Sequence, residues 1–250
     1  MTELAIIFGS GFERLGLAVL TRSPTKTPYG EPTSAVLTVA IGGVRVACIA
    51  RHGERHEWAP HEINYRANLW ALHSRGVTRV LSVCTVGGIT AEFTAGVLAV
   101  PDQIIDYTWG RKSTFFEGAE QPVVHVDFTH PYDEPTRELL LAAAADAGEA
   151  VVPRGTYAAV QGPRLETAAE VNRLDRDGAH LVGMTGMPEA ALARELGLAY
   201  AAIAVVANPA AGRSGSRESI SLEGIAQVLD TAMGRVRTII EKAVVRHGRP

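Results

Sequence analysis

The chain has 250 residues, a length that suits one large domain or two small ones. Its hydrophobic fraction of 46% and charged fraction of 20% are those of an ordinary globular protein. The formal net charge of -3 argues against a nucleic-acid binder, which usually presents a basic face.

No run reaches the roughly 18 apolar residues of a membrane span, and the first residues lack the basic start of a signal peptide. We therefore expect a cytoplasmic protein with no membrane contact. Cys48 and Cys84 lie in apolar runs and are predicted to be buried thiols, as in a reducing compartment. Nothing marks a domain boundary, so residues 1–250 are predicted to form a single domain.

Apolar runs and glycine stops predict an α/β chain in which strands and helices alternate. In chain order we expect strands at 4–8, 34–41 and 44–50, a helix at 63–75, strands at 79–83, 97–100 and 103–105, a helix at 134–147, a strand at 155–160, helices at 167–176 and 188–196, a strand at 200–207 and a helix at 222–245.

The first predicted strand is followed at once by the turn Gly9-Ser10-Gly11. A glycine-rich turn can place backbone N–H groups around an anion. A dinucleotide fingerprint would need a third glycine where Arg14 stands, so a nicotinamide-dependent oxidoreductase is the weaker alternative.

The hairpin of residues 34–50 delivers the segment 51–56, RHGERH, at a strand end. Its two arginines and two histidines are typical either of a solvated loop or of an oxyanion site, since Arg binds phosphate with a bidentate fork. His56 and His61 are five residues apart with Pro60 between them, so we do not expect a metal site there.

Further polar turns follow other predicted strands. Residues 84–88 (CTVGG) are predicted to turn after the strand at 79–83, and residues 107–121 to form either a lid or a packed surface loop. Thr185 and Asn208 follow two apolar segments, and ligands of parallel α/β sheets bind at the carboxyl ends of strands. Both are therefore site candidates, the alternatives being a helix cap and a turn former.

Four polar turns that follow predicted strands or apolar segments, at residues 9–11, 50–53, 161–164 and 183–185, together resemble the purine nucleoside phosphorylase and methylthioadenosine phosphorylase family over nearly the whole chain. The most specific piece is GMTGMPE at residues 183–189, which is similar to the family's Met-Thr/Ser-x-x-Pro-Glu signature. The resemblance implies a single α/β domain with a mixed, partly barrel-like sheet flanked by helices, usually assembled as a trimer.

The resemblance also implies phosphorolysis, in which phosphate attacks C1′ of a purine nucleoside and no metal or organic cofactor takes part. The residues that match the family's phosphate ligands are Ser10, Arg51, His52, the backbone at Thr85, and Thr185. Those that match its nucleoside contacts are Met184 beneath the ribose, Leu165 where an aromatic residue usually stacks on the base, Glu166, Asn208 at the purine N7 edge, and His125, which a neighbouring subunit would contribute. Asn208 and Thr185 would be the catalytic pair.

The base pocket departs from the adenine-specific pattern of the family. Adenine-specific members carry Asp at the position of Asn208 and again at that of Ala210, and Ser at that of Glu166. The combination implies a hypoxanthine or guanine site on a methylthioadenosine-type scaffold, hence cleavage of methylthioinosine to hypoxanthine and 5-methylthioribose 1-phosphate. Phosphorolysis of inosine or guanosine, phosphorolysis of methylthioadenosine, and a nucleoside-binding module without catalysis are the alternatives.

Overall fold

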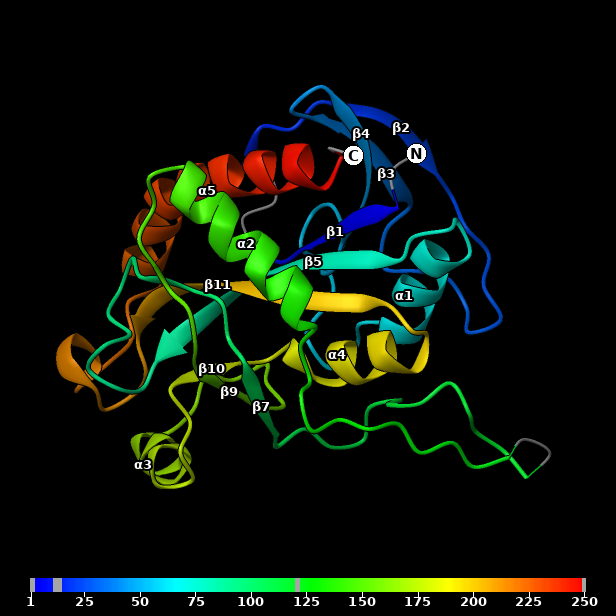
Figure 1. Ribbon diagram of the computed structural model, residues 1–250. Helices are drawn as coiled ribbons and strands as arrows, with labels where there is room; N and C mark the ends of the chain where they lie inside the picture. Colours follow the sequence, from blue (N-terminus) through cyan, green and yellow to red (C-terminus); the bar gives the residue numbers. More distant parts are fainter. Residues whose placement is uncertain (1–2, 11–14, 120–121, 249–250) are drawn as a thin grey trace.

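The computed structural model describes residues 3–10, 15–119 and 122–248. Within these ranges an eleven-stranded mixed sheet is flanked by five α-helices (Figure 1). Neighbouring strands follow the order β2-β3-β4-β1-β5-β10-β9-β7, and β11 pairs with both β5 and β6. The predicted α/β class with a mixed sheet is therefore confirmed.

The strands are β1 (Leu4–Phe8), β2 (Val19–Ser23), β3 (Val36–Ile41), β4 (Val44–Ala50), β5 (Arg79–Gly88), β6 (Leu98–Ala99), β7 (Gln103–Asp106), β8 (Val151–Val152), β9 (Thr156–Ala159), β10 (Leu181–Gly183) and β11 (Ala199–Pro209). The helices are α1 (Tyr65–His73), α2 (Glu134–Asp146), α3 (Ala168–Arg176), α4 (Gly186–Glu195) and α5 (Leu222–His247), with a 3-10 turn η2 (Ser214–Ser216).

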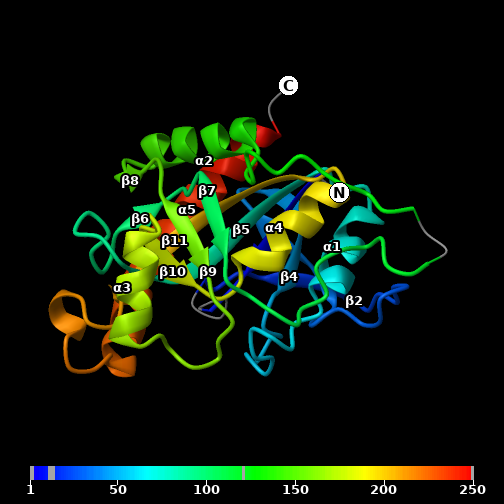
Figure 2. The same ribbon diagram turned by 90° about the horizontal axis from the view of Figure 1, so that it is seen from below.

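Both faces of the central sheet are covered, which explains why its strands are unbroken apolar runs. In β1, Ala5 and Ile7 belong to one core cluster, while Leu4, Ile6 and Phe8 belong to another. Helices α1 and α4 pack side by side over the first face, and α2 and α5 over the second (Figures 1 and 2).

Strand β5 is longer than the sequence predicted. Residues 84–88 were expected to turn, but they continue the strand to Gly88 because they have partners on both sides. β11 pairs in parallel with the whole of β5, and β10 pairs antiparallel with its last residues, Gly87 and Gly88. Two glycines therefore stand in a strand where neighbouring backbone comes close, rather than in a turn.

Strand β11 also runs further than predicted, through Asn208 to Pro209. Its register against β5 shifts between Val206 and Asn208, so that Ala207 is an extra residue in the ladder. Such a bulge re-aims the side chains beside it. The short strands β2 and β8 were not predicted, since β2 is largely exposed and β8 has only two residues.

The ends of α4 and the start of α3, both close to the candidate site, agree with the sequence prediction. Met187 has extended backbone angles inside α4, so the regular part of that helix begins at Pro188, as predicted. Gly197, with φ of 67°, follows its end. Thr167 caps α3 through a capping box with Glu170.

The segment between β7 and α2 forms neither helix nor strand at residues 107–119 and 122–133. Figure 1 shows it extending away from the sheet beneath α4. Cys48 and Cys84 are buried and unpaired, as predicted, and burial raises the pKa of both thiols, that of Cys84 to about 12.

The close approach at Gly88 can be tested by substitution. A Cβ at Gly88 would lie 1.7 Å from the carbonyl oxygen of Phe93, so we expect Gly88→Ala to lower the free energy of unfolding by about 1–3 kcal/mol. Gly234, in exposed α5 backbone with open space around it, is the matched control, and Gly234→Ala should raise stability by about 0.5–1 kcal/mol. Urea denaturation measures both, and equal stabilities would contradict the assigned packing.

Candidate functional site

The ends of several strands meet at one edge of the sheet. Strands β4, β1, β5 and β11 are mutually parallel, so their carboxyl ends point the same way. β10 runs antiparallel to the far end of β5 and therefore returns toward the middle of that strand. This reversal brings the turn after β10, which contains Thr185, beside the ends of the parallel strands.

A cavity of about 560 Å³ opens at this edge, within the size range of small-molecule sites. It contains nine of the ten residues predicted to form the site: Ser10, Arg51, His52, Thr85, Leu165, Glu166, Met184, Thr185 and Asn208. The tenth, His125, is exposed and does not line the cavity. Gly11 and Arg14 lie outside the described residues.

Arg51, at the end of β4, is buried, with 1% of its surface exposed. Its Nε and Nη2 donate to the two carboxylate oxygens of Glu189 at 2.6 and 2.8 Å. Nη1 donates to the Val83 carbonyl and Nη2 to the Ser82 hydroxyl. Burial lowers the pKa of Arg51, but the charge of Glu189 more than offsets it, so the guanidinium is firmly protonated.

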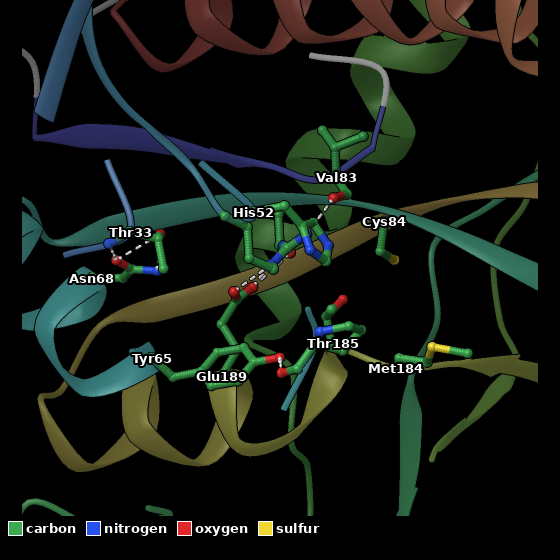
Figure 3. Close-up of polar contacts among 12 residues, drawn as sticks. Thr33, His52, Tyr65, Asn68, Val83, Cys84, Met184, Thr185 and Glu189 are labelled. Carbon is green, nitrogen blue, oxygen red and sulfur yellow. Dashed lines mark hydrogen bonds and ion pairs between the residues drawn. The ribbon is translucent and has the colours of Figure 1, made fainter. Parts of the chain in front are cut away.

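Glu189 also accepts hydrogen bonds from the hydroxyls of Ser82 (2.9 Å) and Tyr200 (2.8 Å). In Figure 3 its carboxylate rises from α4 toward the sheet. In the sequence, Glu189 belongs to the family signature and lies at the start of a predicted helix, where no local pattern indicates a role for it. Nothing in the spacing of the chain indicates a partner 138 residues away.

A guanidinium has five N–H donors, and the four hydrogen bonds of Arg51 use four of them. The fifth donor, on Nη1, takes part in none of the four. That nitrogen lies under Gly9, where a Cβ would come within 2.7 Å of it. Because Gly9 has no side chain, the turn after β1 can lie directly on the guanidinium. Arg51 thus offers the cavity a fixed N–H whose positive charge is already balanced by Glu189.

His52 is held in one neutral form. Its Nδ1 is 2.9 Å from the carbonyl oxygen of Trp58, so Nδ1 carries the hydrogen and Nε2 is left as an acceptor. Its ring stacks on that of His56, 4.4 Å away. Burial, with the neighbouring charge of Arg51, lowers the pKa of His52 to about 4, so the imidazole is uncharged at neutral pH.

The turn that carries Thr185 is fixed by Tyr157 from β9. The backbone N–H of Thr185 donates to the Tyr157 hydroxyl at 3.3 Å. A Cβ at Gly183 would lie 2.2 Å from the same hydroxyl, and one at Gly186 would lie 2.9 Å from the ring. These glycines therefore allow the turn to wrap around a buried phenol. The Thr185 hydroxyl does not cap α4, so Thr185 lines the cavity instead of serving as the predicted alternative, a helix cap.

Two polar side chains stand on another part of the cavity wall. Glu166 precedes α3, and burial raises the pKa of its carboxyl. Asn208 lies at the β11 bulge, and its Nδ2 donates to the carbonyl of Pro209 at 2.7 Å. This bond directs the amide and leaves Oδ1 and the second N–H for a ligand. Leu165 is 41% exposed at the cavity rim.

An apolar part of the cavity was not found from the sequence. Ile220, Leu222 and Ile225, from the start of α5 and the residues before it, line it together with Trp58. Leu222 is 72% exposed although it is large and apolar. Leu222 and Ile225 fall at the start of the helix predicted for residues 222–245, and no sequence pattern separates a ligand wall from helix packing.

The part of the chain that the structure describes holds no group of three or more His, Cys, Asp or Glu side chains arranged for a metal ion. Nor does any described helix have the length and apolar character needed to cross a membrane.

Comparisons with known proteins show the family to which the chain belongs. The chain belongs to the phosphorylase superfamily, whose family model matches residues 3–245. A curated relative, the probable S-methyl-5′-thioinosine phosphorylase of Xanthomonas campestris, is 51% identical over 95% of each chain. The 6-oxopurine nucleoside phosphorylase of Pyrococcus furiosus is 46% identical over 87% of this chain and 83% of its own.

Solved structures of this family have the same fold. Methylthioadenosine phosphorylase from Schistosoma mansoni, solved with adenine, superposes with a TM-score of 0.93 at 30% identity, covering 99% of this chain and 92% of its own. The family predicted from the polar turns is thereby confirmed, and the chain is an enzyme of the nucleoside phosphorylase type.

The Arg51–Glu189 pair yields a stability prediction. Glu189→Gln keeps the side-chain shape but leaves the buried guanidinium without its counter-charge, so we expect the free energy of unfolding to fall by about 3–5 kcal/mol. The control is Glu54→Gln, whose partner Arg22 is more than half exposed, and the loss there should stay within about 1 kcal/mol. Urea denaturation at one protein concentration compares them, and a Glu189→Gln protein as stable as the control would refute the pairing.

Proposed function

We propose that this enzyme cleaves S-methyl-5′-thioinosine with inorganic phosphate, giving hypoxanthine and 5-methylthioribose 1-phosphate. One observation carries the proposal: a single cavity is lined both by the predicted phosphate ligands Ser10, Arg51 and Thr185 and by the predicted base contacts Glu166 and Asn208. A phosphorolytic enzyme needs both, because the attacking anion and the departing base lie on opposite sides of C1′.

Phosphate is proposed to lie against the ends of β1, β4 and β5. Donors there are the spare N–H of Arg51, the hydroxyls of Ser10 and Thr185, and the backbone at Thr85. Glu189 balances the charge of Arg51, and His52 is neutral. Phosphate would therefore be bound mainly by oriented hydrogen-bond donors, and less by a net positive charge of the site. Such fixed donors keep the nucleophile aligned below C1′.

The sugar and base are proposed to occupy the rest of the cavity. Met184 would pack beneath the ribose, where a cation-like oxocarbenium character develops as the glycosidic bond breaks. The free Oδ1 of Asn208 would accept from N7–H as the base leaves, and its second N–H would donate to O6. Leu165 offers the base an aliphatic contact where related enzymes stack an aromatic ring.

The methylthio group is proposed for the 5′ position because the cavity contains an apolar wall of Ile220, Leu222 and Ile225. The named relatives from Xanthomonas and Pyrococcus support a 6-oxopurine nucleoside. Inosine and guanosine are the second candidates, since exchanging one small apolar group in such a pocket changes specificity by only about 1–3 kcal/mol. We propose no metal or organic cofactor, phosphate being a co-substrate, and a cytoplasmic location, which suits two free thiols.

The base preference is the direct test. An ionised Glu166 accepts from N1–H of hypoxanthine but faces a lone pair on adenine, so methylthioinosine should be preferred over methylthioadenosine by up to ~10⁴-fold in kcat/KM. The raised pKa of Glu166 adds a pH dependence. Its protonated form can donate to adenine N1, so the preference should fall as pH falls.

The assay incubates methylthioinosine, methylthioadenosine, inosine and guanosine with and without phosphate, and identifies the products by chromatography. Asn208→Asp should weaken the preference, because a carboxylate that can take up a proton serves both N7 and the adenine amine. Equal cleavage of methylthioinosine and methylthioadenosine would refute the base assignment, and turnover without phosphate would refute phosphorolysis.

We further propose a homotrimer in which His125 contributes to the site of a neighbouring subunit. His125 is exposed on the segment between β7 and α2 and does not line the cavity of its own chain. Sedimentation velocity should therefore give a trimer, and His125→Ala should raise the KM for methylthioinosine several-fold. His73→Ala, on the exposed face of α1, is the control. A fully active monomer at assay concentration would disprove this arrangement.

A further inference from the structure

Arg111 is a side chain that neither the sequence motifs nor the proposed chemistry uses. It lies in the segment between β7 and α2, and its guanidinium makes more hydrogen bonds than that of any other arginine in the described residues. The predicted loop at residues 107–121 is thus packed against the domain at this point. The arrangement calls for an explanation, because a surface loop does not require so many contacts.

The acceptors of Arg111 belong to two segments that both line the cavity. On one side, Nη2 donates to the carbonyls of Gln161 (2.7 Å) and Val160 (3.3 Å), and Nε to the side-chain oxygen of Gln161 (3.2 Å). On the other, Nη1 donates to the carbonyls of Met184 (2.7 Å) and Met187 (2.6 Å). One rigid, planar group therefore joins the end of β9 to the turn between β10 and α4.

Each of these segments carries part of the site. The carbonyls of Val160 and Gln161 directly precede the stretch that presents Leu165 and Glu166 to the cavity. The carbonyls of Met184 and Met187 enclose Thr185 within one turn of chain. The separation between the base-binding side chains and the phosphate-binding turn is thus set by the width of one guanidinium.

The electrostatics point the same way. All six acceptors given for Arg111 are uncharged: four carbonyls, one amide oxygen and the Tyr65 hydroxyl at 3.3 Å, whose ring also lies 5.7 Å beneath the guanidinium. Unlike Arg51, Arg111 has no carboxylate among these partners. No carboxylate among these partners neutralises its positive charge, which lies beside the turn that holds Thr185.

We propose that Arg111 is a positioning residue for phosphorolysis, which fixes the distance between the base and phosphate halves of the site by bridging the carbonyls of residues 160–161 and 184–187. The inference rests on the proposed function, since it concerns the same site. Arg111 is not proposed as a catalytic residue, because it does not line the cavity in which phosphate and the base are proposed to bind.

The test compares Arg111→Ala and Arg111→Lys with Lys112→Ala, the next residue in the chain, which pairs only with exposed Glu117. A displacement of about 1 Å in a reacting group can cost 10²-fold, so Arg111→Ala should lower kcat/KM for methylthioinosine by about that factor. Lysine restores the charge but has a single nitrogen that cannot reach both segments, so Arg111→Lys should remain about tenfold impaired. Lys112→Ala should match the wild type.

Two readouts separate positioning from a loss of folding. Guanidinium ion, added far below denaturing concentrations, should restore part of the activity of Arg111→Ala but not of Arg111→Lys, whose side chain fills the space. The KM values for phosphate and for methylthioinosine should both rise, because both halves shift. Wild-type kinetics in Arg111→Ala, or a loss that follows only the unfolded fraction and no rescue, would overturn the proposal.

A measurement independent of turnover distinguishes this inference from the proposed function. Hydrogen exchange followed by mass spectrometry should show faster exchange in peptides covering residues 160–167 and 183–190 of Arg111→Ala, with Lys112→Ala unchanged. If the wild-type enzyme cleaved none of the nucleosides, the proposed phosphorolysis would be refuted, but the hydrogen-exchange result would still test the bridging role of Arg111. Unchanged exchange in both peptides would refute the bridging role whatever the activity.

Discussion

The buried ion pair between Arg51 and Glu189 joins the parts of the molecule from which the site is built. It links the end of β4 to α4, and its hydrogen bonds include Ser82 and Val83 in β5 and Tyr200 in β11. With 1% of either side chain exposed, neither charge could remain there without the other. The strand ends and the first turn of α4 must therefore come together as one unit.

This pairing changes how the anion site works. A free arginine would attract phosphate through its charge, whereas Arg51 is neutralised by Glu189 and presents a single oriented N–H. The neighbouring His52 is also uncharged at neutral pH. In the proposed phosphate site, selectivity would then rest on the directions of donors from several strands, and such directions depend on the surrounding backbone. That dependence is why the positions of the two segments held by Arg111 matter.

Two irregular features of the sheet place the remaining groups. The antiparallel return of β10 along β5 brings the Thr185 turn back over the parallel strands, and the Ala207 bulge in β11 turns Asn208 toward the cavity. Close contacts around the β10 return select glycine. Gly183 lies against the Tyr157 hydroxyl and Gly87 against Val182, so a larger side chain would displace the wall of the site.

The α/β class, most strands and helices, the family, and nine residues that share one cavity could be predicted from the amino-acid sequence, because local periodicity and short motifs are properties of neighbouring residues. That residues 84–88 are strand could be seen only in the folded chain, since their hydrogen-bond partners belong to β10 and β11. The tertiary structure alone pairs Arg51 with Glu189, 138 residues away, and gathers six acceptors around Arg111. Contacts between distant segments depend on how the elements pack, and no local pattern encodes that packing.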